Sequence, residues 1–450
     1  MRTTMNQAHA AGLTDKQLDS YWMPYTSNRE FKANPRIITH AKGNYLYDAE
    51  GRKILDGLSG LWTCGAGHSR PEIAEAVAKQ LTTIEYAPAF QYGHPLAFQL
   101  AERIADMSPA GMNKVFFTNS GSESADTSTK IARAYWRQRG EATKTRIIGR
   151  AKGYHGASWG GISFGGIGGN RKMWGQAMES DHLNHTWRPS MAFTKGMPTE
   201  GAELANELED LVTLHDASNI AAVIVEPFAG SAGVIVPPVG YLKRLREICD
   251  KHRILLIFDE VITGLGRAGA TFGADAFDVV PDMINVAKQI TNGAIPMGAV
   301  IIKDEIYETF MSAGGAHYNV ELPHGYTYSG HPVACAAAMA TLDILEKEQL
   351  IQRVAQLAPV FEEKVHSLKG IKHITDIRNY GFAAGITLEA YPGEPTRRPW
   401  EVAMECWKKG LYVRYGGDTL QLGVPFTMEV SEMDQIINTL GDAFTTLYGA

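Results

Sequence analysis

Two short apolar runs that each end in charged residues carry the clearest chemistry in this sequence. Residues Ile254–Phe258 are followed directly by Asp259 and Glu260. Residues Met283–Ala287 are followed directly by Lys288. An uninterrupted apolar run of this length is typical of a parallel strand buried on both faces. Because open α/β sheets hold their ligands at the carboxyl ends of such strands, the acids and the amine are expected to meet there.

A lysine in that position can act as a nucleophile, because burial lowers its pKa and favours the neutral amine. A neutral amine and a carboxylate are the groups that hold pyridoxal phosphate (PLP): the amine forms an aldimine, and the acid faces the pyridinium nitrogen. Taken alone, Lys288 is more often a solvated charge, and the pair Asp259 and Glu260 more often caps a turn. The other strand ends are therefore needed to favour a cofactor site.

A capped helix follows another expected strand. The run Lys114–Thr118 precedes an S-x-x-E pattern formed by Ser120 and Glu123, and the helix is expected to continue to about Arg139 and to stop at Gly140. The turn before this helix presents free backbone N–H groups and the positive end of the helix dipole, which suits a phosphate. An ordinary capped helix is the simpler alternative.

Two further strand ends carry polar side chains. Tyr154 stands between glycines after the run Thr145–Gly149, where its ring could stack on a planar cofactor for about 1 kcal/mol. Glu226 and Pro227 end the run Ala221–Val225. A buried carboxylate is rare unless it is paired or functional. The alternatives are a surface turn around the tyrosine and a strand stop at the proline.

The candidates for substrate contacts lie outside these runs. Arg414 lies in the segment YVRYGG, and its rigid guanidinium suits a carboxylate, although an exposed strand arginine would look the same. Trp62 fits a pocket wall as well as a core or an interface.

Two glycine-rich segments point to no site. Gly264–Gly269 match the dinucleotide pattern GxGxxG, but Asp259–Thr263 separate them from the strand, so they do not form its first tight turn. Gly160–Gly169 are expected to form a flexible loop.

Composition excludes several classes of protein. A net charge of −6 over 450 residues argues against a nucleic-acid or acidic-membrane surface as the main partner. No apolar run reaches the length of a transmembrane helix, and no secretory signal is visible at the start of the chain. The cysteines are scattered without a CxxC pair, which argues against a disulfide framework or a zinc site. We therefore expect a cytoplasmic α/β protein.

The pattern along the chain predicts three parts. Residues 1–70 contain short alternating segments and are expected to form an N-terminal arm and part of a small domain. Residues 71–325 alternate helices, such as Tyr241–His252, with short buried strands, which predicts a large domain with a mostly parallel sheet flanked by helices. Residues 326–450 are expected to form an α+β small domain, packed with the N-terminal arm.

Taken together, these segments resemble the class III, fold-type I PLP-dependent aminotransferases. The similarity runs along nearly the whole chain, in the segments TNSGSES, GYHG, IVEP, FDEVITGLGR, AKQITNGAIPMGAV and HGYTYSGHPVACAA. Three further segments resemble the ω-amino acid:pyruvate (β-alanine:pyruvate) branch: WMPYT, SGLWTCGAGH and YVRYGGDTLQ. The order and spacing of so many segments is more specific than any single motif.

The resemblance implies a role for each cofactor residue. Lys288 would form the internal aldimine and then carry the proton between carbon atoms, while Asp259 would keep the pyridine nitrogen protonated. The resemblance implies that Ser120, Gly121 and Ser122 bind the phosphate, together with Thr327 of the partner subunit. Tyr154 and Val261 would contact the two faces of the ring. His155 and Glu226 would support the surroundings of the cofactor.

The resemblance also implies a reaction. An ω-amino acid or amine similar to β-alanine would give its amino group to pyruvate, leaving an aldehyde or keto acid and L-alanine by a ping-pong mechanism. Trp62, Tyr25 and Phe90 would line the substrate pocket, and Arg414 would bind the carboxylate of pyruvate or move aside for an amine without one. A homodimer or homotetramer with shared sites is implied.

Other functions stay open at this point. An aminomutase or a PLP-dependent decarboxylase has the same fold and needs no second substrate. An NAD-dependent oxidoreductase would use Gly264–Gly269. A PLP-binding or interaction protein without activity is a third alternative, against which the presence of both Lys288 and Asp259 argues. The sequence does not rank the amine donors.

Overall fold

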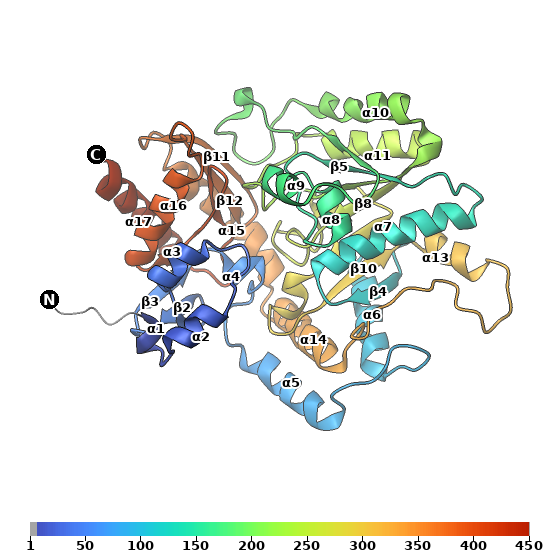
Figure 1. Cartoon of the computed structure of the whole chain (residues 1–450), viewed down its shortest axis with the longest axis horizontal. Helices are drawn as coiled ribbons and strands as arrows, with labels where there is room; N and C mark the ends of the chain where they lie inside the picture. The colour runs from blue at the N-terminus through green and yellow to red at the C-terminus, as the bar shows by residue number, and fades with distance from the viewer. Residues whose placement is uncertain (1–6, 450) are drawn as a thin grey trace.

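A seven-stranded sheet forms the centre of the molecule in the computed structural model, which describes residues 7–449 (Figure 1). Its strands are, in spatial order, β4 (Lys114–Thr118), β10 (Gly298–Ile302), β9 (Met283–Val286), β8 (Leu255–Asp259), β7 (Ile220–Val225), β5 (Arg146–Arg150) and β6 (Ser180–Leu183).

Only β10 runs against the other strands of this sheet. It pairs antiparallel with both β4 and β9, whereas β9, β8, β7, β5 and β6 form consecutive parallel pairs. The register brings Val225 opposite Phe258, and Phe258 opposite Ile284. The carboxyl ends of β7, β8 and β9 therefore lie side by side, and the prediction of a mostly parallel sheet is confirmed.

The sheet is apolar on both faces because helices cover both. Every residue of β7 and β8 is buried. Leu255 and Ile257 pack in the cluster that includes Ile131 of α7 (Gly121–Gln138), while Leu256 and Phe258 pack in the cluster that includes Leu245 of α11 (Tyr241–His252). The other helices of this part are α5 (Pro71–Thr83), α6 (Pro95–Met107), α8 (Trp159–Phe164), α9 (Gly168–Trp174), α10 (Glu207–His215), α12 (Gly273–Ala276), α13 (Asp304–Met311) and α14 (Pro332–Lys347).

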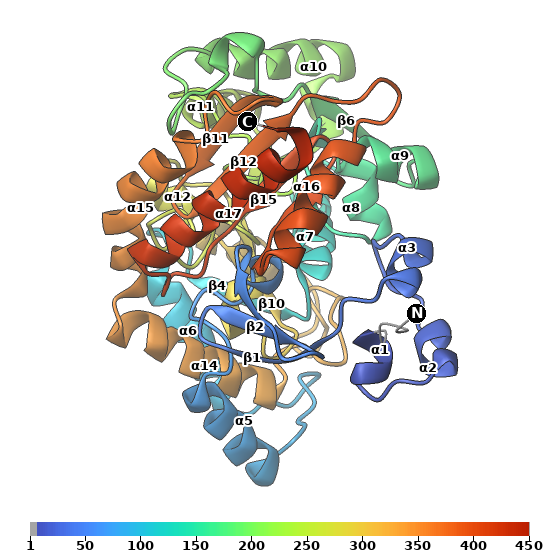
Figure 2. The same ribbon diagram turned by 90° about the vertical axis from the view of Figure 1, so that its left-hand side faces the viewer.

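The two ends of the chain build the rest of the molecule together. The N-terminal strands β1 (Ile38–Lys42), β2 (Tyr45–Asp48) and β3 (Lys53–Asp56) form a sheet whose fourth strand is the C-terminal β13 (Leu411–Tyr412), parallel to β3. Figures 1 and 2 show the blue N-terminal and red C-terminal segments on the same side of the large sheet. The expected small domain from both termini is thus present.

A third sheet completes this small domain. Its strands are, in order, β11 (Ile374–Tyr380), β12 (Ala383–Leu388), β15 (Thr419–Leu422) and β14 (Arg414–Gly416). The helices of the terminal parts are α1 (Gln7–Ala10), α2 (Asp15–Ser20), α3 (Asn28–Ala33), α4 (Ser59–Trp62), α15 (Leu350–His366), α16 (Arg397–Lys408) and α17 (Val430–Tyr448). The domain boundaries after residues 70 and 325 stay a prediction. No helix in the described part of the chain is long and apolar enough to cross a membrane.

The expectation of a flexible loop at Gly160–Gly169 is wrong. Residues Trp159–Phe164 form α8, and the side chains of Ile162 and Phe164 are buried. The glycines are needed for close packing, because a Cβ at Gly161 would collide with the backbone carbonyl of His155. The segment is therefore a packed support behind the strand ends.

Candidate functional site

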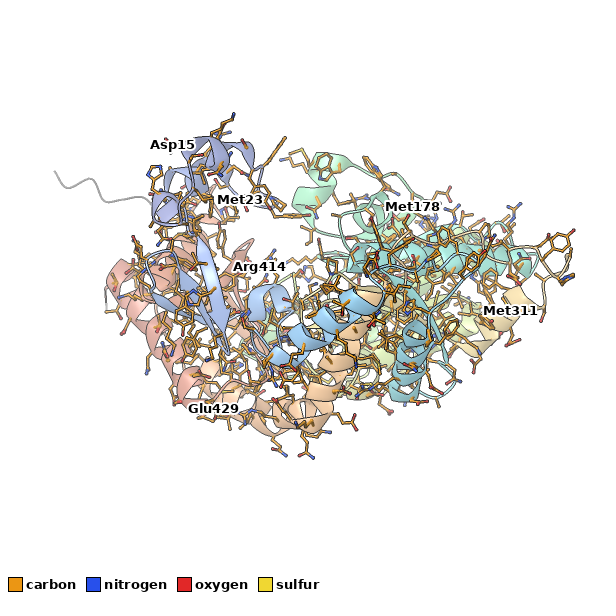
Figure 3. The ribbon with its side chains drawn as sticks, turned by 90° about the horizontal axis from the view of Figure 1, so that it is seen from below. Asp15, Met23, Met178, Met311, Arg414 and Glu429 are labelled. Atoms are coloured by element: carbon orange, nitrogen blue, oxygen red, sulfur yellow. The ribbon has the colours of Figure 1, made fainter. Side chains whose placement is uncertain are left out.

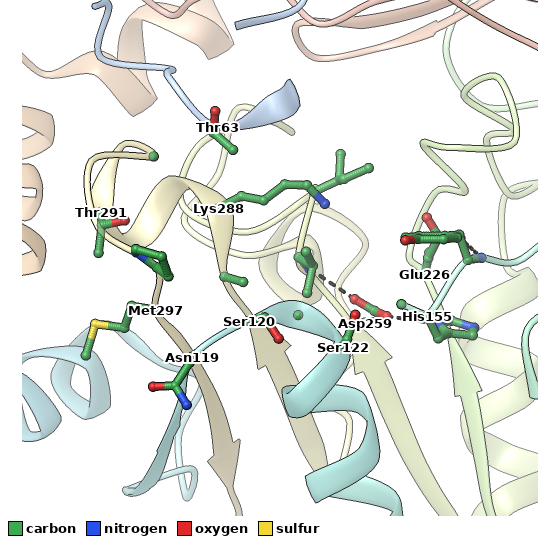
Figure 4. A pocket seen from close by; sticks show the side chains of 18 of the residues that line it. Thr63, Asn119, Ser120, Ser122, His155, Glu226, Asp259, Lys288, Thr291 and Met297 are labelled. Carbon is green, nitrogen blue, oxygen red and sulfur yellow. Dashed lines mark hydrogen bonds and ion pairs between the residues drawn. The ribbon is translucent and has the colours of Figure 1, made fainter. Parts of the chain in front are cut away.

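The strand ends predicted to meet do meet, in one cavity of about 300 Å³ at the carboxyl edge of the sheet (Figure 4). Asp259 ends β8, Glu226 follows β7, and Lys288 follows β9. All three line the cavity, together with Tyr154 and His155 from the segment after β5. The parallel register causes this convergence, because each of these strands delivers its next residue to the same edge.

The Lys288 side chain extends into the cavity (Figure 4). Its backbone has φ +50°, in the left-handed region, and opens a short 3₁₀ turn. Burial lowers the pKa of Lys288 to about 8, against the attraction of the Asp259 and Glu226 carboxylates, and the positive charge of Arg414 lowers it further. No residue in the described range hydrogen-bonds its amine, so the nitrogen is available for chemistry.

Asp259 is held in place by His155. The Nδ1 atom of His155 lies 2.7 Å from Oδ2 of Asp259, and both side chains are buried. The other carboxylate oxygen of Asp259 accepts a hydrogen bond of 3.2 Å from the Val261 backbone N–H. Two directional contacts thus fix the carboxylate, which makes His155 a positioning residue for an acid at the cavity floor.

Glu226 anchors the segment that carries Tyr154. Its carboxylate accepts hydrogen bonds from the backbone N–H groups of Tyr154 (2.9 Å) and Gly230 (3.1 Å). Burial, reinforced by the negative charge of Asp259, raises the pKa of Glu226 to about 7. These bonds set the Tyr154 ring at the cavity wall, so Glu226 supports the site through the backbone.

The N-terminus of α7 points into the same cavity. Ser120 is the N-cap, and its hydroxyl accepts a hydrogen bond of 3.2 Å from the Glu123 backbone N–H. The Glu123 carboxylate reaches back to the backbone N–H of Asn119 (2.7 Å), one residue earlier than the predicted capping box requires. The first N–H groups of this 18-residue helix, at Gly121 and Ser122, are left free for an anion.

Tight packing fixes the cradle formed by Ser120, Gly121 and Ser122. A Cβ at Gly121 would lie 2.9 Å from both γ-carbons of Val261, so only glycine lets this side chain cover the turn. The Ser122 hydroxyl accepts a hydrogen bond of 3.0 Å from the Ala157 backbone N–H, which ties α7 to the segment that contains His155.

Arg414 and Tyr25 lie in a second cavity, of about 410 Å³. Arg414 is on β14, where the terminal part of the chain faces the large sheet domain (Figure 3). It forms no ion pair with any described residue, and its charge acts on Lys288. The Tyr25 hydroxyl donates a hydrogen bond of 3.3 Å to Asn170, and burial together with this neighbouring hydroxyl raises the pKa of Tyr154 to about 12. The second cavity thus adjoins the first.

Three further predicted residues line neither of these two cavities. Trp62 is 3% exposed and packs in a core cluster, with the Arg267 guanidinium carbon 5.6 Å from its ring. Phe90 is exposed beside Gly325, in a separate surface groove. Thr327 is exposed, and its carbonyl accepts a hydrogen bond of 3.0 Å from Tyr86. The contribution of Thr327 from a partner subunit stays a prediction.

Several lining residues were missed from the sequence. Most of them follow Lys288 closely or flank the cradle, and their nearness in the sequence to these predicted residues was the available signal. They are Thr63, Asn119, Gly156, Ile262, Ala287, Thr291, Gly293, Ile295, Pro296 and Met297.

Comparison with known proteins gives the same picture at the level of the whole chain. The family model described as aminotransferase class-III matches residues 26–444. The chain is 61% identical to the beta-alanine–pyruvate aminotransferase of Pseudomonas aeruginosa over 431 residues, which cover 96% of each chain. It is 58% identical to the omega-amino acid–pyruvate aminotransferase of Pseudomonas putida over 442 residues, which cover 98% of each.

Solved structures share the fold over almost their full length. An (S)-enantioselective omega-transaminase from Thermomicrobium roseum has a TM-score of 0.91 at 33% identity, covering 99% of this chain and 100% of that one. An amine transaminase from an uncultivated Pseudomonas species, in its PLP-bound form, has a TM-score of 0.88 at 35% identity, covering 95% and 98%.

The cavity residues fit PLP by their chemistry. Free backbone N–H groups at the α7 N-terminus suit its phosphate. Asp259 offers a fixed carboxylate for the pyridine nitrogen, and Lys288 offers an amine whose lowered pKa favours the neutral form. Tyr154 and Val261 line the space between these groups and can cover a flat ring.

Proposed function

Because this chain belongs to the class III aminotransferase family, we propose that it transfers the amino group of an ω-amino acid or related amine to pyruvate. PLP is its cofactor, the products are an aldehyde or keto acid and L-alanine, and the two half-reactions alternate at one site. The relatives named for β-alanine and ω-amino acids, at 61% and 58% identity, support this choice of donor and acceptor. The observation that carries it is Arg414, which has no ion-pair partner among the described residues and whose charge acts on Lys288.

PLP, when bound, supplies the electron sink that makes the carbon bearing the amino group acidic. In our proposal the neutral Nζ of Lys288 takes the proton from this carbon and would deliver it to a carbon of the cofactor, so that the amino group stays behind when the product leaves. The lowered pKa of about 8 keeps a useful fraction of the amine neutral near physiological pH. Asp259 would hold a proton on the pyridine nitrogen, and the contact of 2.7 Å with His155 keeps the Asp259 carboxylate fixed for this role.

The remaining cofactor residues bind and orient in this proposal. The backbone N–H groups of Gly121 and Ser122 bind the phosphate, with Ser120 holding the turn. Tyr154 and Val261, which line the cavity, would cover the two faces of the ring and exclude water from it. Glu226 acts through the backbone of the Tyr154 segment, to which it is hydrogen-bonded at 2.9 Å.

Arg414 distinguishes the two kinds of substrate in this proposal. Its guanidinium binds the carboxylate of pyruvate, alanine or β-alanine through paired hydrogen bonds. An amine without a carboxylate would leave the charge uncompensated, so Arg414 turns toward the solvent-facing part of the second cavity. Tyr25 lines the same cavity and is assigned to the amine pocket.

We further propose that the working unit is a homodimer or a larger homo-oligomer, with Thr327 of the partner subunit at the phosphate. Two observations support this. Thr327 is exposed on its own chain. Large apolar side chains are exposed in the surrounding surface, including Phe90 (57%), Phe98 (70%) and Tyr328 (58%), and exposed apolar patches mark interaction surfaces.

We assign the reaction to the cytoplasm. All four cysteines are free thiols. Unpaired thiols are typical of proteins that work in a reducing compartment.

The test is the formation of L-alanine from pyruvate by the purified protein supplied with PLP and β-alanine. An aminomutase or a decarboxylase would consume the amine without pyruvate. Consumption of β-alanine at the same rate when pyruvate is left out would therefore contradict the transaminase assignment. Amine donors of different length and charge, such as 4-aminobutyrate and 1-phenylethylamine, rank the preference.

A variant pair tests the role of Arg414. Losing a charge-assisted pair costs about 1.5–3 kcal/mol, so Arg414→Ala should lower kcat/KM for pyruvate by about 10- to 150-fold. The half-reaction with 1-phenylethylamine, followed by the visible absorption of the cofactor, should stay within about threefold of wild type. Arg414→Lys keeps the charge without the fork and should be intermediate for pyruvate. Equal losses for both substrates would remove Arg414 from the carboxylate role.

A further inference from the structure

The arginine of the glycine-rich turn Gly264–Gly269 connects parts of the chain that lie far apart in the sequence. Arg267 is 1% exposed. Its guanidinium donates hydrogen bonds to the backbone carbonyls of Phe382 (3.1 Å) and Val424. It also donates to the Ser59 hydroxyl (3.2 Å). We call Arg267, Ser59, Phe382 and Val424 the Arg267 clasp.

The charge at the centre of the clasp is costly to bury. No acid among the described residues 7–449 forms an ion pair with Arg267, and burial lowers its pKa to about 9. The guanidinium carbon lies 5.6 Å from the centre of the Trp62 ring and 4.7 Å from that of Phe426. Well-packed apolar residues often stabilise such a place at lower cost. The feature that arginine adds is a rigid fork of donors, which fixes its partners in direction.

The clasp holds the small domain against the turn after β8. Ser59 belongs to the N-terminal part, and its hydroxyl also donates to the Gly423 carbonyl (2.6 Å). Phe382 is in the turn between β11 and β12, and its backbone N–H donates to the Arg267 carbonyl (3.1 Å). Val424 follows β15. One side chain therefore reaches the small domain at each of these points.

Two glycines permit the close approach on which the clasp depends. Gly266 has φ +116°, in the left-handed region, and a Cβ there would lie 2.9 Å from the Phe426 ring. At Gly381, next to Phe382, a Cβ would collide with the Arg267 carbonyl. Packing around Arg267 thus accounts for a glycine of the GxGxxG pattern.

The clasp is connected to Arg414 by one strand. Val424 follows the end of β15, and β15 pairs antiparallel with β14, where Arg414 is opposite Gln421. A shift of β15 moves Arg414, because the ladder of hydrogen bonds fixes the two strands to each other. The Arg414 side chain has no ion-pair partner among the described residues, so the strand is what places it in the second cavity.

The same segment is tied to the turn that carries Lys288. The Phe426 backbone N–H donates to the Gly65 carbonyl (2.7 Å). The Gly65 backbone N–H donates to the side-chain carbonyl of Gln289 (2.8 Å), which follows Lys288 directly. The lysine and the strand of the arginine are therefore both connected to residues 424–426, which the clasp holds.

We propose that Arg267 is a positioning residue for carboxylate substrates, which sets the distance between Arg414 and Lys288. The inference rests on the proposed function, in which Arg414 binds the carboxylate of pyruvate while Lys288 moves the proton. A substrate with a carboxylate is held at both ends and needs this distance to be correct. An amine without a carboxylate does not use Arg414, so its reaction depends much less on the clasp.

The experiment compares two substrates in Arg267→Met, which keeps a long unbranched side chain and removes its donors. A misplacement of about 1 Å can cost about 100-fold in rate, so kcat/KM for pyruvate should fall by about 10- to 100-fold. The half-reaction with 1-phenylethylamine should stay within about threefold of wild type. Equal losses for the two substrates would overturn the proposal.

Arg398→Met is the matched control. Arg398 is 4% exposed and donates to the Glu389 carbonyl (2.6 Å). Its guanidinium carbon lies 4.2 Å from the centre of the Tyr391 ring and 4.9 Å from that of Tyr448, but it lines neither cavity. This variant should lower the melting temperature without separating pyruvate from 1-phenylethylamine.

A double variant shows whether Arg267 acts through Arg414. Adding Arg267→Met to Arg414→Ala should lower kcat/KM for pyruvate by less than about threefold, because the residue that Arg267 positions is already absent. Losses that multiply in the double variant would overturn the proposal. If Arg267→Met does not fold, Ser59→Ala removes one partner of the clasp and should lower kcat/KM for pyruvate by about 3- to 10-fold, again with the 1-phenylethylamine half-reaction preserved.

A measurement without catalysis separates this inference from the proposed function. The charges that act on Lys288 are those of Asp259, Glu226 and Arg414, so the loss of the Arg267 charge does not by itself change the Lys288 pKa. In cofactor-free protein, Arg267→Met should raise the pH midpoint of Lys288 acetylation, because Arg414 moves away. An unchanged midpoint would overturn the positioning role. Wild-type protein that forms no alanine from pyruvate would reject the proposed function, and the midpoint would then decide the positioning role.

Discussion

Gly156→Ala is the substitution by which the geometry of the phosphate cradle is best tested. Gly156 has φ +98°, in the left-handed region, which costs a residue with a Cβ about 1–2 kcal/mol. The added Cβ would also lie 2.5 Å from Cα and 2.7 Å from Cβ of Ser122. Such overpacking costs about 1–3 kcal/mol, so the total strain is about 2–5 kcal/mol.

This strain should weaken cofactor binding more than folding. Without cofactor, the segment around Gly156 can move away from α7 and relieve the contact with Ser122. With cofactor, the same movement would open the cradle, so the strain remains and counts against binding. Even the lower figure of about 2 kcal/mol corresponds to an apparent dissociation constant for PLP about 30-fold higher.

The assay is a titration of the cofactor-free variant with PLP, combined with melting temperatures with and without cofactor. Gly441→Ala is the matched control, because Gly441 lies within α17, where an added Cβ would have no other atom within 4 Å, and should gain about 0.5–1 kcal/mol. A Gly156→Ala protein that binds PLP within about twofold of the control would refute the reasoning that this contact holds the cradle closed.

Three further predictions concern the charged groups of the site. In cofactor-free protein, acetylation of Lys288 by acetic anhydride should rise about tenfold per pH unit and level off above about pH 8, because burial lowers its pKa from 10.5 to about 8. Arg414→Met should move the pH midpoint of acetylation upward, because the positive charge of Arg414 lowers the pKa of Lys288. Glu226→Gln should move the midpoint downward, because the negative charge of Glu226 raises the same pKa. Shifts in the opposite directions would contradict this assignment of charges. Asp259→Asn should abolish alanine formation with little change in melting temperature. Glu260→Ala should lower the melting temperature and leave alanine formation largely intact, because each backbone N–H left unpaired costs about 1–3 kcal/mol of folding free energy.

The central sheet was predictable because its signals are local. Strand β4 has the predicted bounds, the other four predicted strands agree within one residue at each end, and α11 spans Tyr241–His252 as its apolar periodicity indicated. Apolar runs of five or six residues between turns leave little freedom, because both faces must be covered. The convergence of Asp259, Glu226 and Lys288 followed from the parallel sheet alone.

Three parts of the structure that could not be predicted from the sequence depend on contacts between segments far apart in the chain. Trp62 has a pocket-like sequence context, yet positive φ angles at Ser59, Gly60 and Trp62 within α4 place its ring beside Arg267 and against Gly423. Strand β10 enters the sheet antiparallel between β9 and β4, which no periodicity reveals. The glycines of Gly160–Gly169 permit close packing of a buried helix, although the same composition is typical of a mobile loop.

The adjacent acids Asp259 and Glu260 stand at the end of the same strand but have different roles, one in the cavity and the other in the turn beside it. Successive side chains of an extended chain point in opposite directions. Asp259 faces the cavity and His155, while Glu260 turns to the other side and accepts hydrogen bonds from the backbone N–H groups of Gly273 and Ala274 and from the Thr263 hydroxyl. Burial raises the pKa of Glu260 to about 7, yet three donors hold it away from the cavity. A raised pKa beside the site therefore does not make Glu260 an acid–base residue, and its hydrogen bonds assign it to the turn that holds Asp259 in place.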